Sequence, residues 1–451
     1  MTATASAWHA EHAWLPEGLR QKVLIEAEGD RLVTIRAGSE PPAGARRLPG
    51  LVLPGLGNAH SHAFQRALRG RSETGLGDFW TWRELMYSLA GALDPDLLFG
   101  LARAAYGEMA LAGYCAAGEF HYLHHGAGGK PYSDPNAMSE ALIAAAAAAG
   151  LRLTLLDACY LQGGLDGRSL EGVQLRFGDG SAAAWAERTS RLRPRPGLRV
   201  GAAIHSVRAV DPAGMAEVVS WAAAEEAPLH AHVSEQPAEN RDSLVATGLT
   251  PAALLDQAGA LGRRFTAVHA THLSEADIAL LGGTRSTVCL CPTTERDLAD
   301  GVGPAAALAS AGSPLCVGSD SQAVIDPFEE ARAVELDERL AGGKRGRHRT
   351  EDLLAALAQN GMAALGWDSG RLEPGRLADF VHLGLDSVRL AGWKPDDLPA
   401  QAVYAATGAD VRDLVVGGRE IVADGRHLAL GDVAALLNEA VARALAALIS
   451  A

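Results

Sequence analysis

The stretch LVLPGLGNAHSH, residues 51–62, is an apolar run that ends in two histidines one residue apart, His60 and His62. Side chains on a β-strand alternate between its two faces, so residues i and i+2 point in the same direction. On a strand, this spacing aims two imidazole rings at one point, an arrangement suited to a divalent transition metal. The same pattern also arises by chance in a chain with 15 histidines. The rest of the sequence must decide between a metal site and a coincidence.

Apolar, β-rich runs alternate with alanine- and leucine-rich helical stretches from about residue 51 to residue 365. We predict strands at 51–58, 113–121, 151–160, 198–205, 227–233, 265–270, 286–291 and 314–319. Helices are expected between them, for example at 212–226 and 251–259. This alternation predicts an α/β fold, a distorted (β/α)8 barrel of the TIM type over residues 51–369.

Both ends of the chain are β-rich as well. VLIEA and RLVTI flank a turn at residues 28–30 and predict a hairpin. Beyond residue 370, RLADFVHLGL and DLVVGGREIVADGR read as strands, and DVAALLNEAVARALAALIS reads as a final helix. We predict that residues 1–50 and 370–451 join into one small β-rich domain beside the barrel.

Polar residues follow the predicted barrel strands at the rim where barrel enzymes place their active sites. The first strand leads to His60 and His62, the fifth to His232 and Glu235, the sixth to His269, and the eighth to Asp320. Buried charge without a partner is costly, and a divalent cation would supply that partner. We predict one metal ion held by His60, His62, His232 and Asp320, with a position left for water. Taken singly, each residue has an ordinary alternative: a hydrogen-bonded structural histidine, or an aspartate that caps the next loop.

A second metal is not expected. Barrel hydrolases with two metals commonly bridge them with a carboxylated lysine from a middle strand. The chain has only four lysines, Lys22, Lys130, Lys344 and Lys394, and none ends the predicted third or fourth strand. Cys289 and Cys291 have a spacing that metal ligands can use, but the seventh strand would also have to reach the metal. We assign structural roles to five further histidines: His121, His124, His125, His230 and His272.

Two segments do not fit the regular alternation. The long connection at 63–112 contains DFWTWRELMYSL, an aromatic stretch that could fold over the barrel mouth, with Trp80 and Trp82 packing this cover. Residues 162–195 are rich in glycine and arginine and read as a loop insertion.

The overall composition excludes several classes of protein. The net charge of −14 argues against nucleic-acid binding, which needs a basic face. The five cysteines lie in apolar runs and read as buried free thiols of a reducing compartment. No signal peptide and no membrane-spanning run is visible, so we expect a cytoplasmic protein without a membrane partner.

Eight sequence motifs resemble those of a known family. They are NAHSHAFQRAL, FWTWRELMY, EFHYLHH, HSVRAV, HVSEQ, VHATH, GSDS and EPGRLADFV. The set resembles the amidohydrolase superfamily in its mononuclear deaminase branch, and within that branch the formimidoylglutamate deiminase family. The resemblance covers nearly the whole chain. FWTWRELMY, EFHYLHH and HSVRAV are its most specific parts, and segment 162–195 is matched least well.

The resemblance implies roles for individual residues. It implies metal ligands at His60, His62, His232 and Asp320, with Glu235, His269 and Asp320 in the chemistry. It also implies substrate contacts from Gln65, Arg83, Tyr122, His205 and Arg208. Arg208 has independent support because it follows the fourth predicted strand and lies three residues after His205. Arginine suits carboxylates because its guanidinium pairs with them through two parallel hydrogen bonds.

The implied reaction is metal-dependent hydrolysis of N-formimidoyl-L-glutamate to N-formyl-L-glutamate and ammonia, a step of histidine breakdown. The implied cofactor is one divalent ion, Zn²⁺, although the same ligands also suit Fe²⁺, Mn²⁺ or Ni²⁺. A homodimer is expected from the superfamily. Three alternatives stay open: a deaminase of an aminopurine or related amine, a hydrolase that releases formamide and glutamate, and a catalytically silent binding protein.

Overall fold

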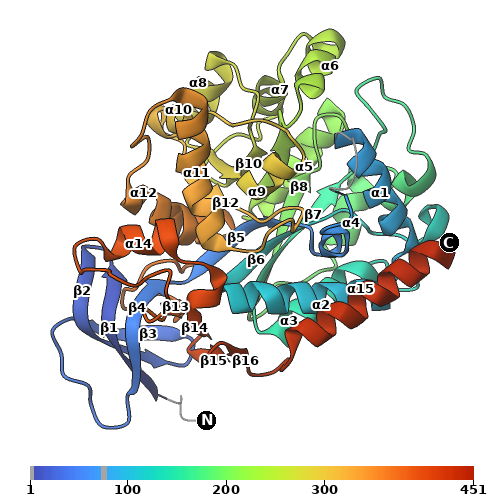
Figure 1. Cartoon of the computed structure of the whole chain (residues 1–451). Coiled ribbons are helices and arrows are strands. Elements are labelled where there is room, and N and C mark those ends of the chain that lie inside the picture. Colours follow the sequence, from blue (N-terminus) through green and yellow to red (C-terminus); the bar gives the residue numbers. More distant parts are fainter. Residues whose placement is uncertain (1–4, 73–78, 451) are drawn as a thin grey trace.

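The computed structural model describes residues 5–72 and 79–450, and contains two eight-stranded sheets (Figure 1). One sheet is entirely parallel, with the order β12-β11-β10-β9-β8-β7-β6-β5. Its strands are β5 (Leu56–Ser61), β6 (Tyr114–His121), β7 (Arg152–Cys159), β8 (Leu198–Ile204), β9 (Leu229–Val233), β10 (Phe265–His269), β11 (Thr287–Leu290) and β12 (Leu315–Val317). A bridge between Ser61 and Asp320 brings the two edges together. The predicted distorted (β/α)8 barrel is confirmed.

The second sheet is built from the two ends of the chain, in the order β16-β15-β14-β13-β4-β1-β2-β3. Its strands are β1 (Ala5–Leu15), β2 (Gly18–Glu28), β3 (Arg31–Arg36), β4 (Arg46–Pro54), β13 (Phe380–Leu383), β14 (Val411–Val416), β15 (Arg419–Ala423) and β16 (Arg426–His427). β2 and β3 form the expected hairpin. β13 pairs with β4 and thereby joins the C-terminal strands to the N-terminal ones.

The first predicted strand, 51–58, was wrong in its boundaries. Residues 51–54 end β4 and pair with β13 in the terminal sheet, whereas the barrel strand β5 starts at Leu56 and contains His60. The apolar run is continuous because both strands are buried, and only Gly55 separates the end of β4 from the start of β5. A Cβ on Gly55 would lie 2.7 Å from the Cβ of Asp379, so only glycine fits where the chain passes between the sheets.

Helices surround the barrel. They are α1 (Phe79–Ala92), α2 (Pro95–Ala112), α3 (Ala137–Ala149), α4 (Ala182–Thr189), α5 (Pro212–Ala224), α6 (Pro237–Thr247), α7 (Pro251–Gln257), α8 (Glu275–Thr284), α9 (Pro292–Asp297), α10 (Ala305–Ala311), α11 (Pro327–Gly342), α12 (Thr350–Ala355), α13 (Gly361–Ala364), α14 (Leu398–Ala405) and α15 (Val433–Ser450). Several begin with a capping side chain followed by proline, as at Asp94, Asp211, Thr250 and Asp326. The cap satisfies a free backbone N–H, and proline at the first helical position loses no hydrogen bond.

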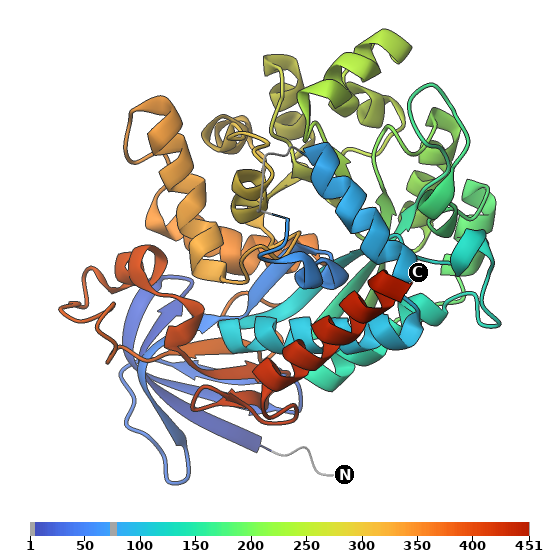
Figure 2. The ribbon, with the colours of Figure 1, turned by 45° about the vertical axis from the view of Figure 1, so that its right-hand side comes forward.

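Two features bear on the barrel mouth. The segment predicted as a loop, 162–195, contains the short helix η3 (Gly172–Arg176) and α4, so that prediction was incomplete. The aromatic stretch forms α1, which lies near the end of the C-terminal helix α15, while α15 runs along α2 (Figure 2). In the described part of the chain, no helix is both long and apolar enough to cross a membrane.

Candidate active site

The four predicted metal ligands meet at one end of the barrel. The Nε2 atom of His60 lies 3.1 Å from Nε2 of His232 and 3.3 Å from Oδ1 of Asp320. The same Asp320 oxygen lies 3.4 Å from Nε2 of His62. Three imidazole nitrogens and one carboxylate therefore face a common centre, and His60, His62 and His232 form a set whose ligand atoms lie within 4.8 Å of one another. This donor set suits a divalent transition metal.

Hydrogen bonds behind the histidines orient their rings. Nδ1 of His62 donates to the backbone oxygen of Phe120 at 2.9 Å, and Nδ1 of His232 donates to that of His205 at 2.8 Å. A neutral ring that donates from Nδ1 presents a lone pair at Nε2, on the side of the shared centre. Burial lowers the pKa of all three imidazoles, and that of His62 falls to about 3. The rings are therefore neutral near pH 7, as metal coordination requires.

Asp320 is placed by the closure of the barrel. Its backbone N–H donates to the oxygen of His60 and its own oxygen accepts from the N–H of His62, both at 3.0 Å. Its φ angle is +42°, a conformation that is unfavourable for residues other than glycine. Two residues earlier, a Cβ on Gly318 would lie 2.7 Å from the backbone of His60, so only glycine allows this approach. The GSDS motif thus brings the eighth strand against the first.

Glu235 and His269 lie beside this centre. Nε2 of His269 is 3.7 Å from Oε1 of Glu235 and 3.8 Å from Oδ2 of Asp320. Its Nδ1 lies 3.4 Å from Oε1 of Glu295, a residue that we did not predict. Burial opposes protonation of His269, but Glu235, Glu295 and Asp320 together raise its pKa to about 10. Burial raises the pKa of Glu235, so its carboxyl group can hold a proton closer to neutral pH.

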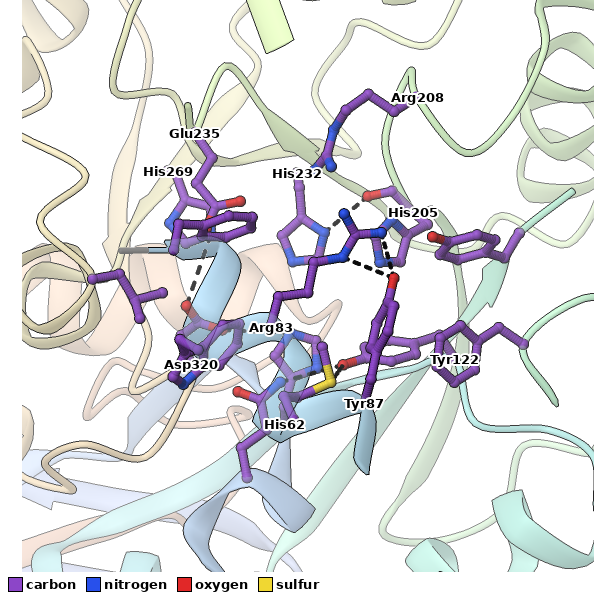
Figure 3. A pocket seen from close by; sticks show the side chains of 17 residues that line it. His62, Arg83, Tyr87, Tyr122, His205, Arg208, His232, Glu235, His269 and Asp320 are labelled. Atoms are coloured by element: carbon purple, nitrogen blue, oxygen red, sulfur yellow. Dashed lines mark hydrogen bonds and ion pairs between the residues drawn. The ribbon is translucent and has the colours of Figure 1, made fainter. Parts of the chain in front are cut away.

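The five predicted substrate residues line the same pocket as the chemistry (Figure 3). Nε2 of Gln65 donates to the hydroxyl of Tyr122 at 3.3 Å. His205 is partly buried beside the His232 ring, with centroids 5.2 Å apart. Among the described residues, Nε of Arg208 makes one long contact, 3.5 Å, to Oε1 of Glu239. Arg83 has no carboxylate partner among the described residues, so the pocket contains two guanidinium groups of which one, Arg208, pairs with a carboxylate, Glu239.

One face of α1 completes the pocket. Residues 79, 82, 83, 86 and 87 all line it, at the i, i+3, i+4, i+7, i+8 spacing of a single helical face. Only Arg83 among them was predicted to contact substrate. The FWTWRELMY periodicity could have revealed Met86 and Tyr87, whereas nothing local indicated Tyr160 and Phe177, which line the pocket from after β7 and from the 162–195 segment.

The histidines assigned to structural roles do not line this pocket. His124, His230 and His272 each use Nε2 to contact a backbone oxygen, at 2.9, 3.0 and 2.7 Å respectively. His125 contacts Asp179 at 3.0 Å. The cysteines are buried free thiols, and Cys291 lies with His269 and Glu295 rather than with the four predicted ligands.

Comparisons with known proteins agree with this geometry. The amidohydrolase family model matches residues 51–421. Formimidoylglutamate deiminase from Pseudomonas aeruginosa is 39% identical over 94% of this chain and 96% of that protein. The 8-oxoguanine deaminase of the same organism is 31% identical over 88% of each chain. A solved amidohydrolase structure from Brucella melitensis superposes on this chain with a TM-score of 0.91 and is 31% identical to it. The superposition covers 98% of this chain and 100% of that one. The chain belongs to the amidohydrolase family.

Proposed function

We propose that the protein is a metal-dependent formimidoylglutamate deiminase, which converts N-formimidoyl-L-glutamate and water to N-formyl-L-glutamate and ammonia. The observation that carries the proposal is that metal ligands, catalytic side chains and two arginines line one pocket. Three of the four metal-ligand side chains (His62, His232 and Asp320) line it together with Glu235 and His269, and Arg83 and Arg208 line the same pocket. His60, the fourth ligand, is buried directly behind them. A substrate with one reactive amidine carbon and two carboxylates needs these two kinds of surface together. The 39% identity to a formimidoylglutamate deiminase adds independent support.

The site residues divide the chemistry among them. A divalent cation bound to His60, His62, His232 and Asp320 supplies Lewis acidity that activates water for attack on an sp² carbon. We propose Zn²⁺ as this ion. Oδ2 of Asp320 accepts the proton of the attacking water. His269, held by Glu295, stabilises the tetrahedral intermediate from the side of Asp320.

Glu235 determines which bond breaks. Its pKa is raised by burial, so it can take up a proton and deliver it to the terminal nitrogen of the substrate. The carbon–nitrogen bond to that nitrogen then breaks, ammonia leaves, and the formyl group stays on the glutamate nitrogen. Protonation of the other nitrogen would release formamide and glutamate instead.

Arg83 and Arg208 favour a dicarboxylate over a purine. The net charge of the protein is −14, so an anion needs local positive charge to enter. Arg208 is partly exposed and stays charged, because Glu239 and Glu235 offset the burial that would lower its pKa. Cytoplasmic location and a homodimer are further expectations, and gel filtration of the metal-loaded protein tests the latter.

The decisive experiment incubates the zinc-loaded protein with N-formimidoyl-L-glutamate and measures ammonia and N-formyl-L-glutamate. We expect the two products in equal amounts. Formamide with glutamate would identify the hydrolase, and turnover of a purine panel without this substrate would identify an aminopurine deaminase. Metal binding without turnover of either would favour the binding protein. Glu235→Gln should keep the metal and lower kcat by about two orders of magnitude or more.

The carboxylate contact is tested separately. Arg208→Ala should raise KM for N-formimidoyl-L-glutamate by about tenfold or more, because it removes a charged hydrogen bond to the substrate. Arg191→Ala is the matched control, since Arg191 is exposed and pairs with Glu187 on α4 outside the pocket. An unchanged KM in Arg208→Ala would mean that no substrate carboxylate lies there.

A further inference from the structure

Arg83 is held in the pocket by a phenol rather than by an acid. Its Nε donates to the Tyr87 hydroxyl at 2.8 Å, and its Nη2 donates to the same oxygen. The guanidinium carbon also lies 4.8 Å from the centre of the Tyr87 ring (Figure 3). Nε and Nη2 form one of the two edges with which arginine can chelate a carboxylate. The phenol therefore occupies an edge of the Arg83 guanidinium that a carboxylate can also bind.

The Tyr87 hydroxyl is itself held from the other side. Nε2 of Gln174 donates to it at 3.3 Å and also donates to the hydroxyl of Tyr160 at 3.3 Å. In its contacts with Arg83 and Gln174 the Tyr87 oxygen is the acceptor. Its own proton is not used in these two contacts, and the hydroxyl also hydrogen-bonds with Tyr160, a partner that an acceptor on a bound substrate can replace. Tyr87 lines the same pocket as Arg83 and Arg208, so a bound substrate can reach it.

The segment that carries Gln174 is firmly attached to α1. Arg176, two residues later, donates to the backbone oxygen of Gly91 at 2.8 Å and also to those of Ala90 and Leu93, at the end of α1. Its Nε donates to the oxygen of His125 after β6 at 2.8 Å. Arg176 is buried, so these bonds lie away from water. The 162–195 segment therefore fixes the helix that bears Tyr87 and Arg83 to the barrel wall.

We propose that Tyr87 is a substrate-binding residue that the family resemblance did not indicate. It presents the Arg83 guanidinium to one carboxylate of the substrate and donates its hydroxyl proton to that same carboxylate, while Gln174 holds the phenol in place. This inference rests on the proposed dicarboxylate substrate. When the carboxylate enters, Arg83 exchanges its bonds to the phenol for bonds to the carboxylate. The hydroxyl then gains an acceptor and keeps the Gln174 bond, so no donor is left without a partner.

Tyr87→Phe tests the proposal because it removes the hydroxyl and keeps the ring that stacks on Arg83. We expect KM for N-formimidoyl-L-glutamate to rise by about tenfold while kcat changes by less than about threefold, since the lost bond lies away from the reacting carbon. Tyr404→Phe is a matched control: the Tyr404 hydroxyl also accepts from an arginine, Arg339, but on α14 and α11 outside the pocket. It should leave KM unchanged.

The double variant distinguishes a shared carboxylate from two separate effects. If Tyr87 and Arg83 act on the same carboxylate, Tyr87→Phe should change KM by less than about twofold in an Arg83→Ala background. Gln174→Leu should raise KM by less than Tyr87→Phe does, because it loosens the phenol without removing it. A wild-type KM in Tyr87→Phe, or effects of Tyr87→Phe and Arg83→Ala that simply multiply, would overturn the proposal.

A binding measurement separates this inference from the proposed function. Calorimetric titration with N-formyl-L-glutamate needs no turnover, and we expect about tenfold weaker binding to Tyr87→Phe than to the wild type. If the wild type binds this dicarboxylate but does not release ammonia from N-formimidoyl-L-glutamate, the proposed reaction fails and the Tyr87 contact is still decided by the titration. Equal affinity of the two proteins, or no binding to either, would overturn the role of Tyr87.

Discussion

The barrel contains two buried groups of histidine and aspartate that differ in how their carboxylate is satisfied. At the rim, His60, His62, His232 and Asp320 converge with no arginine or lysine paired to Asp320 among the residues that the structure describes. Beside β6 and β7, His121, His124 and Asp157 also bring ligand atoms within 4.8 Å of one another. There, however, Arg188 donates to both oxygens of Asp157, at 2.8 and 3.0 Å.

The two groups differ in what pairs with the carboxylate: Asp157 is paired with an arginine of the protein, Arg188. Asp157 also accepts hydrogen bonds from Trp185 at 2.9 Å and Thr189 at 3.1 Å, so the protein itself satisfies this carboxylate. Burial would raise its pKa, but Arg188 and His124 lower it to about 2. Among the described residues, Oδ1 of Asp320 contacts the neutral rings of His60 and His62, and His269 lies 3.8 Å from its Oδ2. Ligand types alone therefore do not identify a metal site. What distinguishes the two carboxylates is that an arginine hydrogen-bonds both oxygens of Asp157, whereas no arginine or lysine among the described residues pairs with Asp320.

The largest expected effect comes from changing the two aspartates in the same way. Asp320→Asn should remove the metal and lower kcat/KM by at least about three orders of magnitude, because it removes both a ligand and a proton acceptor. Metal content measured by atomic emission, together with ammonia release, checks this. Asp157→Asn is the control, and should keep the metal while lowering stability. If Asp157→Asn lost the metal and Asp320→Asn kept it, the metal site would be the group at Asp157 and not the one at Asp320.

Arg188→Met should lower the free energy of unfolding by about 3–5 kcal/mol, since it leaves Asp157 and Asp179 buried without their cation. Urea unfolding of the zinc-loaded protein measures the change. Metal content of the folded protein should stay at the wild-type level. Arg191→Met removes an exposed arginine that pairs with Glu187, and should cost less than about 1 kcal/mol. A cost below about 1 kcal/mol for Arg188→Met would show that the second group does not depend on its arginine.

Acid should destabilise the protein through buried neutral histidines outside the rim. Burial lowers the pKa of His230 to about 4, and burial together with Arg188 lowers that of His124 to about 4. In the unfolded chain both titrate near about 6.5. Between these values the unfolded chain binds more protons, so the free energy of unfolding falls as pH drops from about 6.5 to 4. One such group accounts for up to about 3 kcal/mol.

His230→Gln isolates one of these contributions. The variant should unfold with a shallower pH dependence than the wild type in this window, because it has no ring to protonate on unfolding. Urea unfolding at several pH values above and below the window provides both curves. If the free energy of unfolding depended on pH equally steeply in the two proteins, His230 would not contribute to the acid destabilisation.

The smallest effect concerns a single hydrogen bond in the second group. Thr189→Val replaces the hydroxyl that donates to Asp157 with a methyl of similar size, and should cost about 1–2 kcal/mol. Thermal unfolding measures it, with Thr247→Val as the control because the Thr247 hydroxyl bonds to nearby backbone groups of Ser243 and Leu249 at the end of α6. Equal losses in the two variants would mean that Asp157 does not need this donor.

Much of the fold could be predicted because each barrel strand is a short buried run between helical stretches. β6 and β7 are buried at every residue, which makes them conspicuous in the sequence. The same property caused the error at 51–58, since an apolar run does not show which of two sheets it joins. The short helix η3 was missed for a different reason: its glycine- and arginine-rich segment is held by Arg176 bonding to distant backbone oxygens.

By itself, the sequence determined which segments are strands or helices, and which side chains of one element point in the same direction. The alternation of a strand turns His60 and His62 the same way, and the period of a helix puts Arg83 and Tyr87 on one face. Only the tertiary structure decided which faces meet. His60 reaches Asp320, Glu295 reaches His269, and Gln174 reaches Tyr87 through packing between elements far apart in the chain. Local periodicity sets the direction of a side chain, whereas its partner depends on how strands and helices close around a shared core.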